Sequence, residues 1–129
     1  MTSELRMLAL SIVLGLVHIV LSSQAKSWQY GYRWTAGARD DPVPRLGPMA
    51  GRLERALQNF LETFPLFAAA VLMAHVANRH DAFTYWGAQL YFWARVGYLP
   101  LYAFAVPLIR SLIWNVAAAG ICLILIALI

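Results

Sequence analysis

Three polar residues at helical spacing stand at the edge of a long apolar region of the chain. Arg55, Asn59 and Glu62 occupy positions i, i+4 and i+7, so on a helix their side chains share one face. The same segment continues into a hydrophobic run from Pro65 to Val76, which predicts that the helix enters a membrane. A charge within a bilayer costs at least about 2.5–3.5 kcal/mol on insertion scales, so these residues are candidates for a functional site.

A second polar stripe lies in the next apolar segment, where Arg95, Tyr98 and Tyr102 stand at i, i+3 and i+7. Counted from the loop side of an antiparallel pair, the two stripes match at three depths: Arg55 with Tyr102, Asn59 with Tyr98, and Glu62 with Arg95. We predict a structural ion pair between Glu62 and Arg95, which would lower the cost of burying either charge near mid-bilayer. The other four residues are predicted to contact a ligand, although interhelical hydrogen bonding alone is the alternative interpretation.

Arg110 and Ser111 are predicted to begin the last apolar segment, on the same side of the membrane as Arg55. The N-terminus of a helix attracts anions, because its first backbone N–H groups have no partner within the helix. A permanent cation at the same place favours the thiolate form of a bound thiol. The pair therefore predicts an anion or thiolate site.

The amino-acid composition indicates the class of fold that holds these residues in place. The chain has 129 residues, of which 61% are hydrophobic and only 12% charged, and this excludes an ordinary soluble domain. We predict one all-α integral membrane domain over residues 1–129, with four transmembrane helices. Their expected bounds are about 4–25, 52–77, 82–106 and 109–129, with a loop over about 27–51.

The distribution of positive charge predicts the orientation in the membrane. Six of the ten Lys and Arg residues lie between or just inside the first two spans: Lys26, Arg33, Arg39, Arg45, Arg52 and Arg55. The positive-inside rule places this loop and Arg110 in the cytoplasm, and both termini on the other side. Aromatic residues of the same loop are interpreted as interfacial anchors: Trp28, Tyr30, Tyr32 and Trp34. No basic face stands apart from the membrane, so nucleic-acid binding is not predicted.

Other reactive residue types are interpreted as structural. The single Cys122 lies in the last apolar segment and has no partner for an intramolecular disulfide. His18 is expected to pack within the first span, and no further ligand completes a metal site with His75 and His80, so no metal is predicted. The first span has the apolar core of a signal peptide, but Glu4 disfavours that interpretation.

Three motifs resemble those of the MAPEG family, the membrane-associated proteins of eicosanoid and glutathione metabolism. They are Glu54-Arg55-x3-Asn59-x2-Glu62 followed by Phe64-Pro65-Leu66-Phe67, then Ala94-Arg95-x2-Tyr98-x3-Tyr102, and finally Arg110-Ser111. The chain looks most like the small bacterial members, and the resemblance covers essentially its whole length. It implies a four-helix bundle in the bacterial inner membrane, a homotrimer, and glutathione bound between subunits on the cytoplasmic side.

The resemblance also implies a role for each matching residue. Glutathione would be held by Lys26, Arg55, Asn59, Glu62, Tyr98 and Tyr102. Arg110 would stabilise the glutathione thiolate and Ser111 would assist it. The thiolate would then attack a lipophilic electrophile or peroxide that arrives from the bilayer.

The reaction itself stays open at this point. Gln58 and Trp114 stand where some members of the family carry an arginine and a tyrosine, respectively. Our leading prediction is a glutathione-dependent transferase or peroxidase, whose partners are lipids, a lipophilic substrate and other copies of itself. The alternative is a non-catalytic lipid-binding or scaffolding protein of the same fold. A small multidrug transporter is a third possibility, disfavoured if Arg95 neutralises Glu62.

Overall fold

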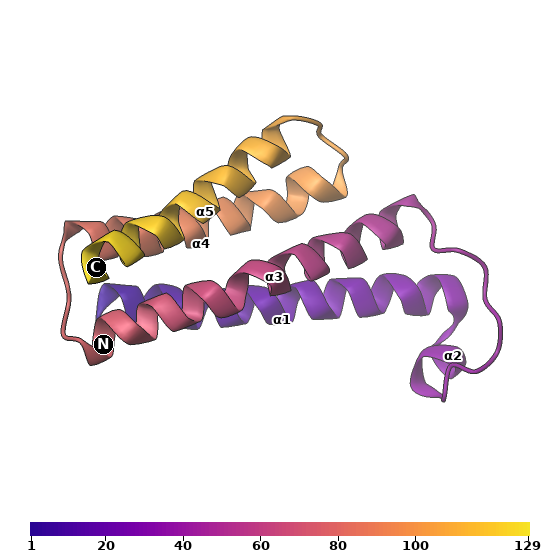
Figure 1. Ribbon diagram of the computed structural model, residues 1–129. Helices are drawn as coiled ribbons and strands as arrows, with labels where there is room; N and C mark the ends of the chain where they lie inside the picture. Colours follow the sequence, from indigo (N-terminus) through magenta and orange to yellow (C-terminus); the bar gives the residue numbers. More distant parts are fainter.

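A computed structural model describes residues 1–129 and contains only helices (Figure 1). There are five: α1 (Ser3–Tyr30), α2 (Tyr32–Ala36), α3 (Pro48–Val76), α4 (Ala82–Ala103) and α5 (Ile109–Leu128). The prediction of an all-helical protein is confirmed. Four of the helices are long, and their positions along the chain follow the four predicted segments.

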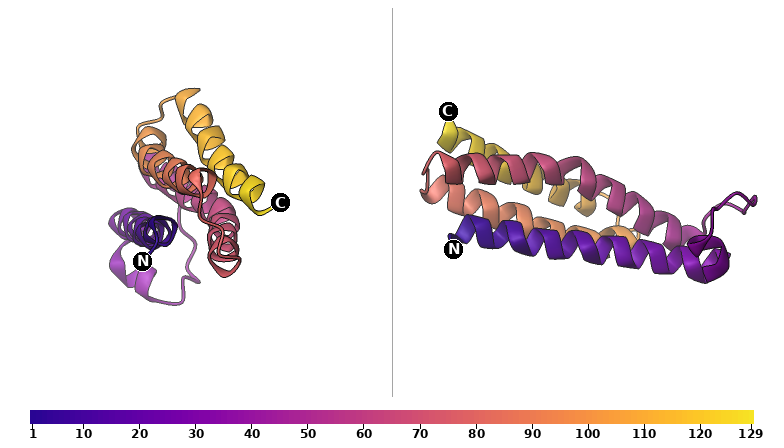
Figure 2. Two further views of the ribbon diagram at one scale, coloured as in Figure 1. Left: turned by 90° about the vertical axis from the view of Figure 1, so that its left-hand side faces the viewer. Right: turned by 90° about the horizontal axis from the view of Figure 1, so that it is seen from below.

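The four long helices lie side by side, and each runs opposite to the one before it (Figures 1 and 2). Helix α1 packs on α3 and α4, and α5 packs on α4 and α3. Both termini lie at one end of the molecule. The opposite end, called the loop end here, carries the connection that contains α2 and also the turn between α4 and α5 (Figure 1). This topology brings Lys26, Arg55 and Arg110 to the same end.

Three helices, α1, α3 and α5, are long and apolar enough to cross a membrane, which supports an integral membrane protein. Helix α4 has 22 residues but is not among them. Its Trp and Tyr side chains and Arg95 lower its mean hydropathy, although its length is sufficient. The predicted span over 82–106 therefore stays a prediction.

The first connection is shorter than the predicted loop over 27–51. Helix α1 continues to Tyr30 and ends at Gly31, whose φ of 93° suits glycine. Helix α3 begins at Pro48, a residue that fits the first turn of a helix because it has no N–H to satisfy. Helix α2 occupies part of the intervening segment, so residues 37–47 are the irregular portion.

The closest packing is between α4 and α5. A Cβ atom added at Gly87 would lie 2.5 Å from the carbonyl oxygen of Gly120, so the two backbones touch. Small residues permit such an approach between membrane helices. At the end that carries the termini, Thr84 donates a 2.6 Å hydrogen bond to the buried carboxylate of Glu4, which joins α4 to α1. These contacts fix α4 between its neighbours and therefore fix the positions of its tyrosines.

Candidate functional site

A cavity of about 300 Å³ lies beside the turn between α4 and α5, and we call it the turn cavity. Three helices line it, with the residues Asn59, Tyr98, Tyr102, Arg110, Ser111, Trp114 and Asn115. Five of these seven were predicted as site residues from the sequence. The lining contains one cation and no carboxylate, so the cavity is suited to an anionic or polar ligand.

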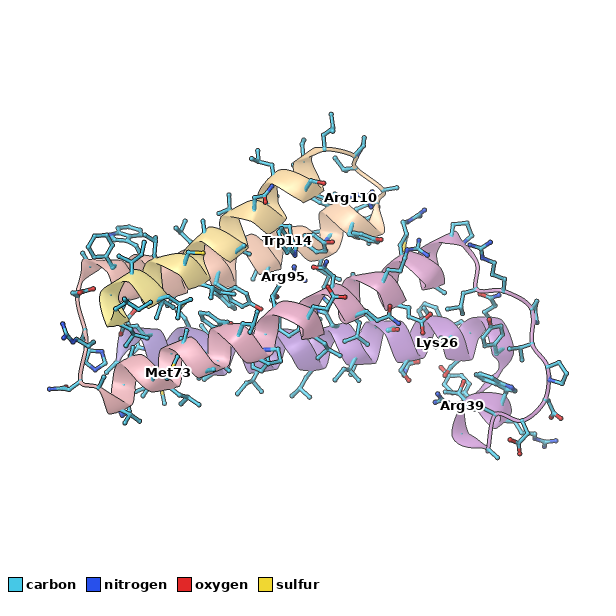
Figure 3. All side chains as sticks on the ribbon, in the orientation of Figure 1. Lys26, Arg39, Met73, Arg95, Arg110 and Trp114 are labelled. Atoms are coloured by element: carbon cyan, nitrogen blue, oxygen red, sulfur yellow. The ribbon has the colours of Figure 1, made fainter.

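Arg110 is the only charged group of the turn cavity. Its guanidinium lies over the ring of Tyr102, 4.9 Å from the ring centroid, and it makes no ion pair or side-chain hydrogen bond. Figure 3 labels Arg110 and Trp114 where α5 and the end of α4 diverge near the turn. Arg110 therefore has its N–H donors available for a ligand.

The start of α5 adds to the positive potential at the cavity. Arg110 and Ser111 lie in its first turn, and no side chain caps this helix. The first backbone N–H groups of a helix have no intrahelical acceptor, and together with the helix dipole they favour an anion nearby. The guanidinium and the helix terminus thus act in the same direction.

The tyrosines of α4 connect the turn cavity to α3. The rings of Tyr98 and Tyr102 stack with a centroid separation of 5.5 Å. The Tyr102 hydroxyl accepts a 3.1 Å hydrogen bond from Nε of Arg55. This contact agrees with the predicted pairing of Arg55 and Tyr102 at equal depth.

The ion pair predicted between Glu62 and Arg95 does not form within this chain. Arg95 donates from Nη1 to the amide oxygen of Asn59 over 2.7 Å, and no ion pair joins it to Glu62. Arg95 is fully buried, whereas Glu62 is exposed. Residues at equal depth meet only if both helices turn the right face toward each other, and Glu62 lies outside the buried face of α3. The long side chain of Arg95 reaches instead one turn toward the loop end.

Aromatic rings provide most of the remaining surroundings of Arg95. Its guanidinium carbon lies 4.2 Å from the ring centroid of Tyr98 and 5.5 Å from that of Phe60. Such cation–π contacts stabilise a desolvated guanidinium. The Nε and Nη2 atoms have no hydrogen-bond partner, so Asn59 supplies the one hydrogen bond of this buried cation.

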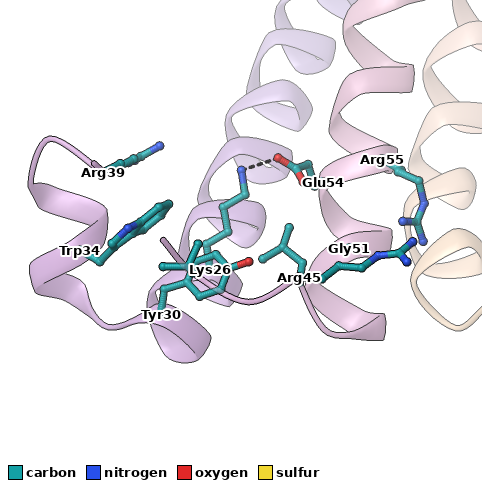
Figure 4. Close-up of a pocket in the computed structure, with 10 residues that line it drawn as sticks. Lys26, Tyr30, Trp34, Arg39, Arg45, Gly51, Glu54 and Arg55 are labelled. Atoms are coloured by element: carbon teal, nitrogen blue, oxygen red, sulfur yellow. Dashed lines mark ion pairs between the residues drawn. The ribbon is translucent and has the colours of Figure 1, made fainter. Parts of the chain in front are cut away.

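Lys26 lies in a second cavity of about 390 Å³, which we call the loop cavity (Figure 4). Its polar and aromatic lining comprises Lys26, Tyr30, Trp34, Arg39, Arg45, Glu54 and Arg55. Lys26 forms a 2.6 Å ion pair with Glu54. Arg55 lines the loop cavity and also bonds to Tyr102 of the turn cavity, so it stands between the two. Glu62 lines neither.

Two residues of the turn cavity were not predicted as part of the site. Trp114 and Asn115 follow Arg110 and Ser111 by four positions, so they lie on the same face of α5. This four-residue spacing is the feature of the sequence that could have assigned Trp114 and Asn115 to the site. The indole Nε1 of Trp114 is buried without a hydrogen-bond partner.

Comparison with known proteins bears on the identity of the fold. No curated protein and no solved structure is significantly similar to this chain. The sequence model of the MAPEG family, in contrast, matches residues 7–129, which is nearly the full length. The match spans α1 to α5, and so includes every helix that lines the turn cavity. The chain belongs to the MAPEG family.

Proposed function

We propose that this protein is a glutathione-dependent membrane transferase or peroxidase, and that its thiolate site is the turn cavity. One observation carries the proposal: a guanidinium without a counterion lies in a cavity lined by hydroxyl and amide groups and free of carboxylates. Membership of the MAPEG family supports the same class of function.

The side chains present fit the functional groups of glutathione. The tripeptide carries two carboxylates, one ammonium group and one thiol. Lys26 and Arg55 suit its carboxylates, and the exposed Glu62 suits its ammonium group. Arg55 and Glu62 are both exposed on α3, so a neighbouring copy of the chain would have to cover them. We therefore propose a homotrimer of four-helix bundles with glutathione between subunits.

In the proposed reaction, Arg110 stabilises the sulfur of glutathione as the thiolate. The proton leaves to water, and the Ser111 hydroxyl donates a hydrogen bond to the sulfur. The thiolate then attacks an electrophilic carbon, and a carbon–sulfur bond forms as the leaving group departs. With a hydroperoxide it attacks the terminal oxygen instead: the O–O bond breaks, an alcohol is released, and a second glutathione converts the resulting sulfenic acid into glutathione disulfide and water. Tyr98 and Tyr102 orient the tripeptide through their hydroxyl groups, while Asn59 holds the amide backbone of the ligand.

We further propose that α4 crosses the membrane with the other three long helices, in the inner membrane of a bacterium. The loop end, with most of the positive charge, would face the cytoplasm, and both termini would lie on the other side. Glutathione would then enter from the cytoplasm, and the lipophilic substrate would enter from the bilayer.

The test is a titration of the detergent-solubilised protein with glutathione, followed by the ultraviolet absorbance of the bound thiolate. Arg110→Ala should lose the thiolate signal and lower turnover with a model electrophile by about 10²–10³-fold, the usual cost of removing one preorganised electrostatic group. Arg110→Lys keeps the charge but loses the planar fork, so it should retain part of the signal.

Arg79→Ala is the matched control, because Arg79 is an exposed arginine at the opposite end of the molecule. It should leave thiolate formation unchanged. If the unmodified protein bound glutathione without forming thiolate, the catalytic proposal would be wrong. If it bound no glutathione at all, the lipid-binding alternative would replace it.

A further inference from the structure

Arg95 is a buried cation without a counterion. It is fully buried, and neither of the two ion pairs of the chain includes it. An unpaired buried charge is costly, and apolar side chains can replace even buried ion pairs without loss of stability. Packing alone therefore does not account for an arginine at this position. Its two nearest side-chain partners, Asn59 and Tyr98, both line the turn cavity, which indicates a role in the site.

The hydrogen bond from Arg95 fixes the orientation of the Asn59 amide. A guanidinium has donors and no acceptor, so the amide atom that Nη1 meets at 2.7 Å is the oxygen. The other end of the amide, Nδ2, makes no hydrogen bond within the chain and is not among the enclosed polar atoms. Because Asn59 lines the turn cavity, Nδ2 is the group that remains for a ligand. Arg95 thus makes Asn59 a hydrogen-bond donor toward the cavity.

Arg95 also lies at one end of a stack of side chains that leads to Arg110. Its guanidinium carbon lies 4.2 Å from the ring centroid of Tyr98, and the rings of Tyr98 and Tyr102 are 5.5 Å apart. The guanidinium carbon of Arg110 lies 4.9 Å from the ring centroid of Tyr102. Figure 3 labels Arg110 close to the α4–α5 turn and Arg95 farther from it. The buried arginine therefore supports the inner tyrosine of the proposed site.

We propose that Arg95 is a positioning residue of the turn cavity. It turns the N–H groups of Asn59 toward a backbone carbonyl oxygen of glutathione and packs the ring of Tyr98 in place. The inference rests on the proposed function, because it concerns the same ligand in the same cavity. It adds the polarity of one contact: Asn59 recognises a hydrogen-bond acceptor of the tripeptide, not an N–H group.

The first test exchanges this donor for an acceptor and keeps the contact with Arg95. In Asn59→Asp, one carboxylate oxygen accepts from Arg95 and the other takes the place of Nδ2. The variant should fold, yet bind glutathione at least about tenfold more weakly, since repulsion replaces a hydrogen bond. Calorimetric titration measures Kd, and thermal unfolding without glutathione measures Tm. Asn78→Asp is the matched control: it makes the same exchange at an exposed asparagine at the opposite end and should leave Kd unchanged.

Variants of Arg95 then show whether it acts through Asn59. Arg95→Lys keeps a charged donor and should retain most of the affinity, whereas Arg95→Met should weaken binding about three- to tenfold. At saturating glutathione, Arg95→Met should still form the thiolate, because Arg110 is unchanged. Asn59→Ala should weaken binding less in the Arg95→Met background than in the unmodified protein, because the amide has already lost its orientation.

Two results would overturn this inference and leave the proposed function intact. One is a Kd for Asn59→Asp equal to that of the unmodified protein. The other is an equal loss of affinity on Asn59→Ala in both backgrounds, which would show that Arg95 does not act through Asn59. If the unmodified protein bound no glutathione, the proposed function would be wrong, and this inference with it.

Discussion

Replacing Asn59 by alanine should destabilise the protein, because Asn59 provides the one hydrogen bond of the buried Arg95. The distance from Nη1 to the amide oxygen is 2.7 Å, and the arginine is 0% exposed. The substitution therefore removes the one acceptor of a guanidinium that is shielded from solvent in the intact protein. A hydrogen bond to a charged group contributes about 1.5–3 kcal/mol, so a loss of this size in the free energy of unfolding is expected.

Thermal unfolding in detergent, without glutathione, measures the effect. Asn59→Ala should lower the Tm by several degrees. Asn59→Asp is the matched variant, since it keeps an acceptor at the same place and adds an opposite charge. It should unfold at or above the temperature of the unmodified protein.

Glu62→Gln separates the two possible pairings of Arg95. Glu62 is exposed and makes no hydrogen bond or ion pair, so its substitution should change stability by no more than about 0.5 kcal/mol. If Glu62 instead paired with Arg95, as depth alone predicts, Glu62→Gln would clearly lower the stability of the protein. A Tm for Glu62→Gln as low as that of Asn59→Ala would refute the contact between Arg95 and Asn59.

Two further predictions concern the packing that positions the site. Gly87→Ala should cost about 1–3 kcal/mol by overpacking, because the new Cβ would meet the carbonyl of Gly120 at 2.5 Å. Gly97→Ala on the same helix meets only one side-chain atom at 3.9 Å and should be tolerated; equal Tm values for both variants would contradict the close crossing. Gln29→Ala should release the segment 37–47, seen as faster limited proteolysis there, and an unchanged cleavage rate would show that the other hydrogen bonds suffice.

Helical spacing predicted most of the turn cavity. Tyr98 and Tyr102 share a face of α4, Arg110 and Ser111 begin α5, and the short chain leaves few ways to arrange these helices. Spacing reports which residues share a face of one helix, and a cavity between helices is built from such faces. It did not assign Trp114 to the site, although the same rule applied to α5 would have done so.

The partner of Arg95 could not be predicted by the same reasoning. Depth along the membrane normal places Glu62 opposite Arg95, but contact also depends on rotation about each helix axis and on side-chain length. Thr63 occupies the face of α3 toward α4, where it contacts the hydroxyl of Tyr91 at 3.0 Å. A guanidinium can reach a full turn along the helix, and so it finds Asn59.

The loop cavity was beyond prediction for a different reason. Its aromatic residues were interpreted as interfacial anchors, an assignment that needs only their type and position. Tyr30 and Trp34 also donate hydrogen bonds to backbone carbonyls more than six residues away in the chain. Such contacts depend on the path of an irregular segment, and no periodicity in the sequence encodes that path.

Helix α4 shows how a membrane helix can have low average hydropathy. Its polar atoms are turned inward: Arg95 and Thr84 are fully buried, whereas Trp86 and Trp93 are 58% and 59% exposed. An average over the sequence counts an inward arginine and an outward one alike, but only the outward side chain would meet lipid. The surface that α4 presents is therefore far more apolar than its composition, which supports our proposal that it crosses the bilayer. The polar stripe that lowers its hydropathy is the same stripe that lines the proposed site.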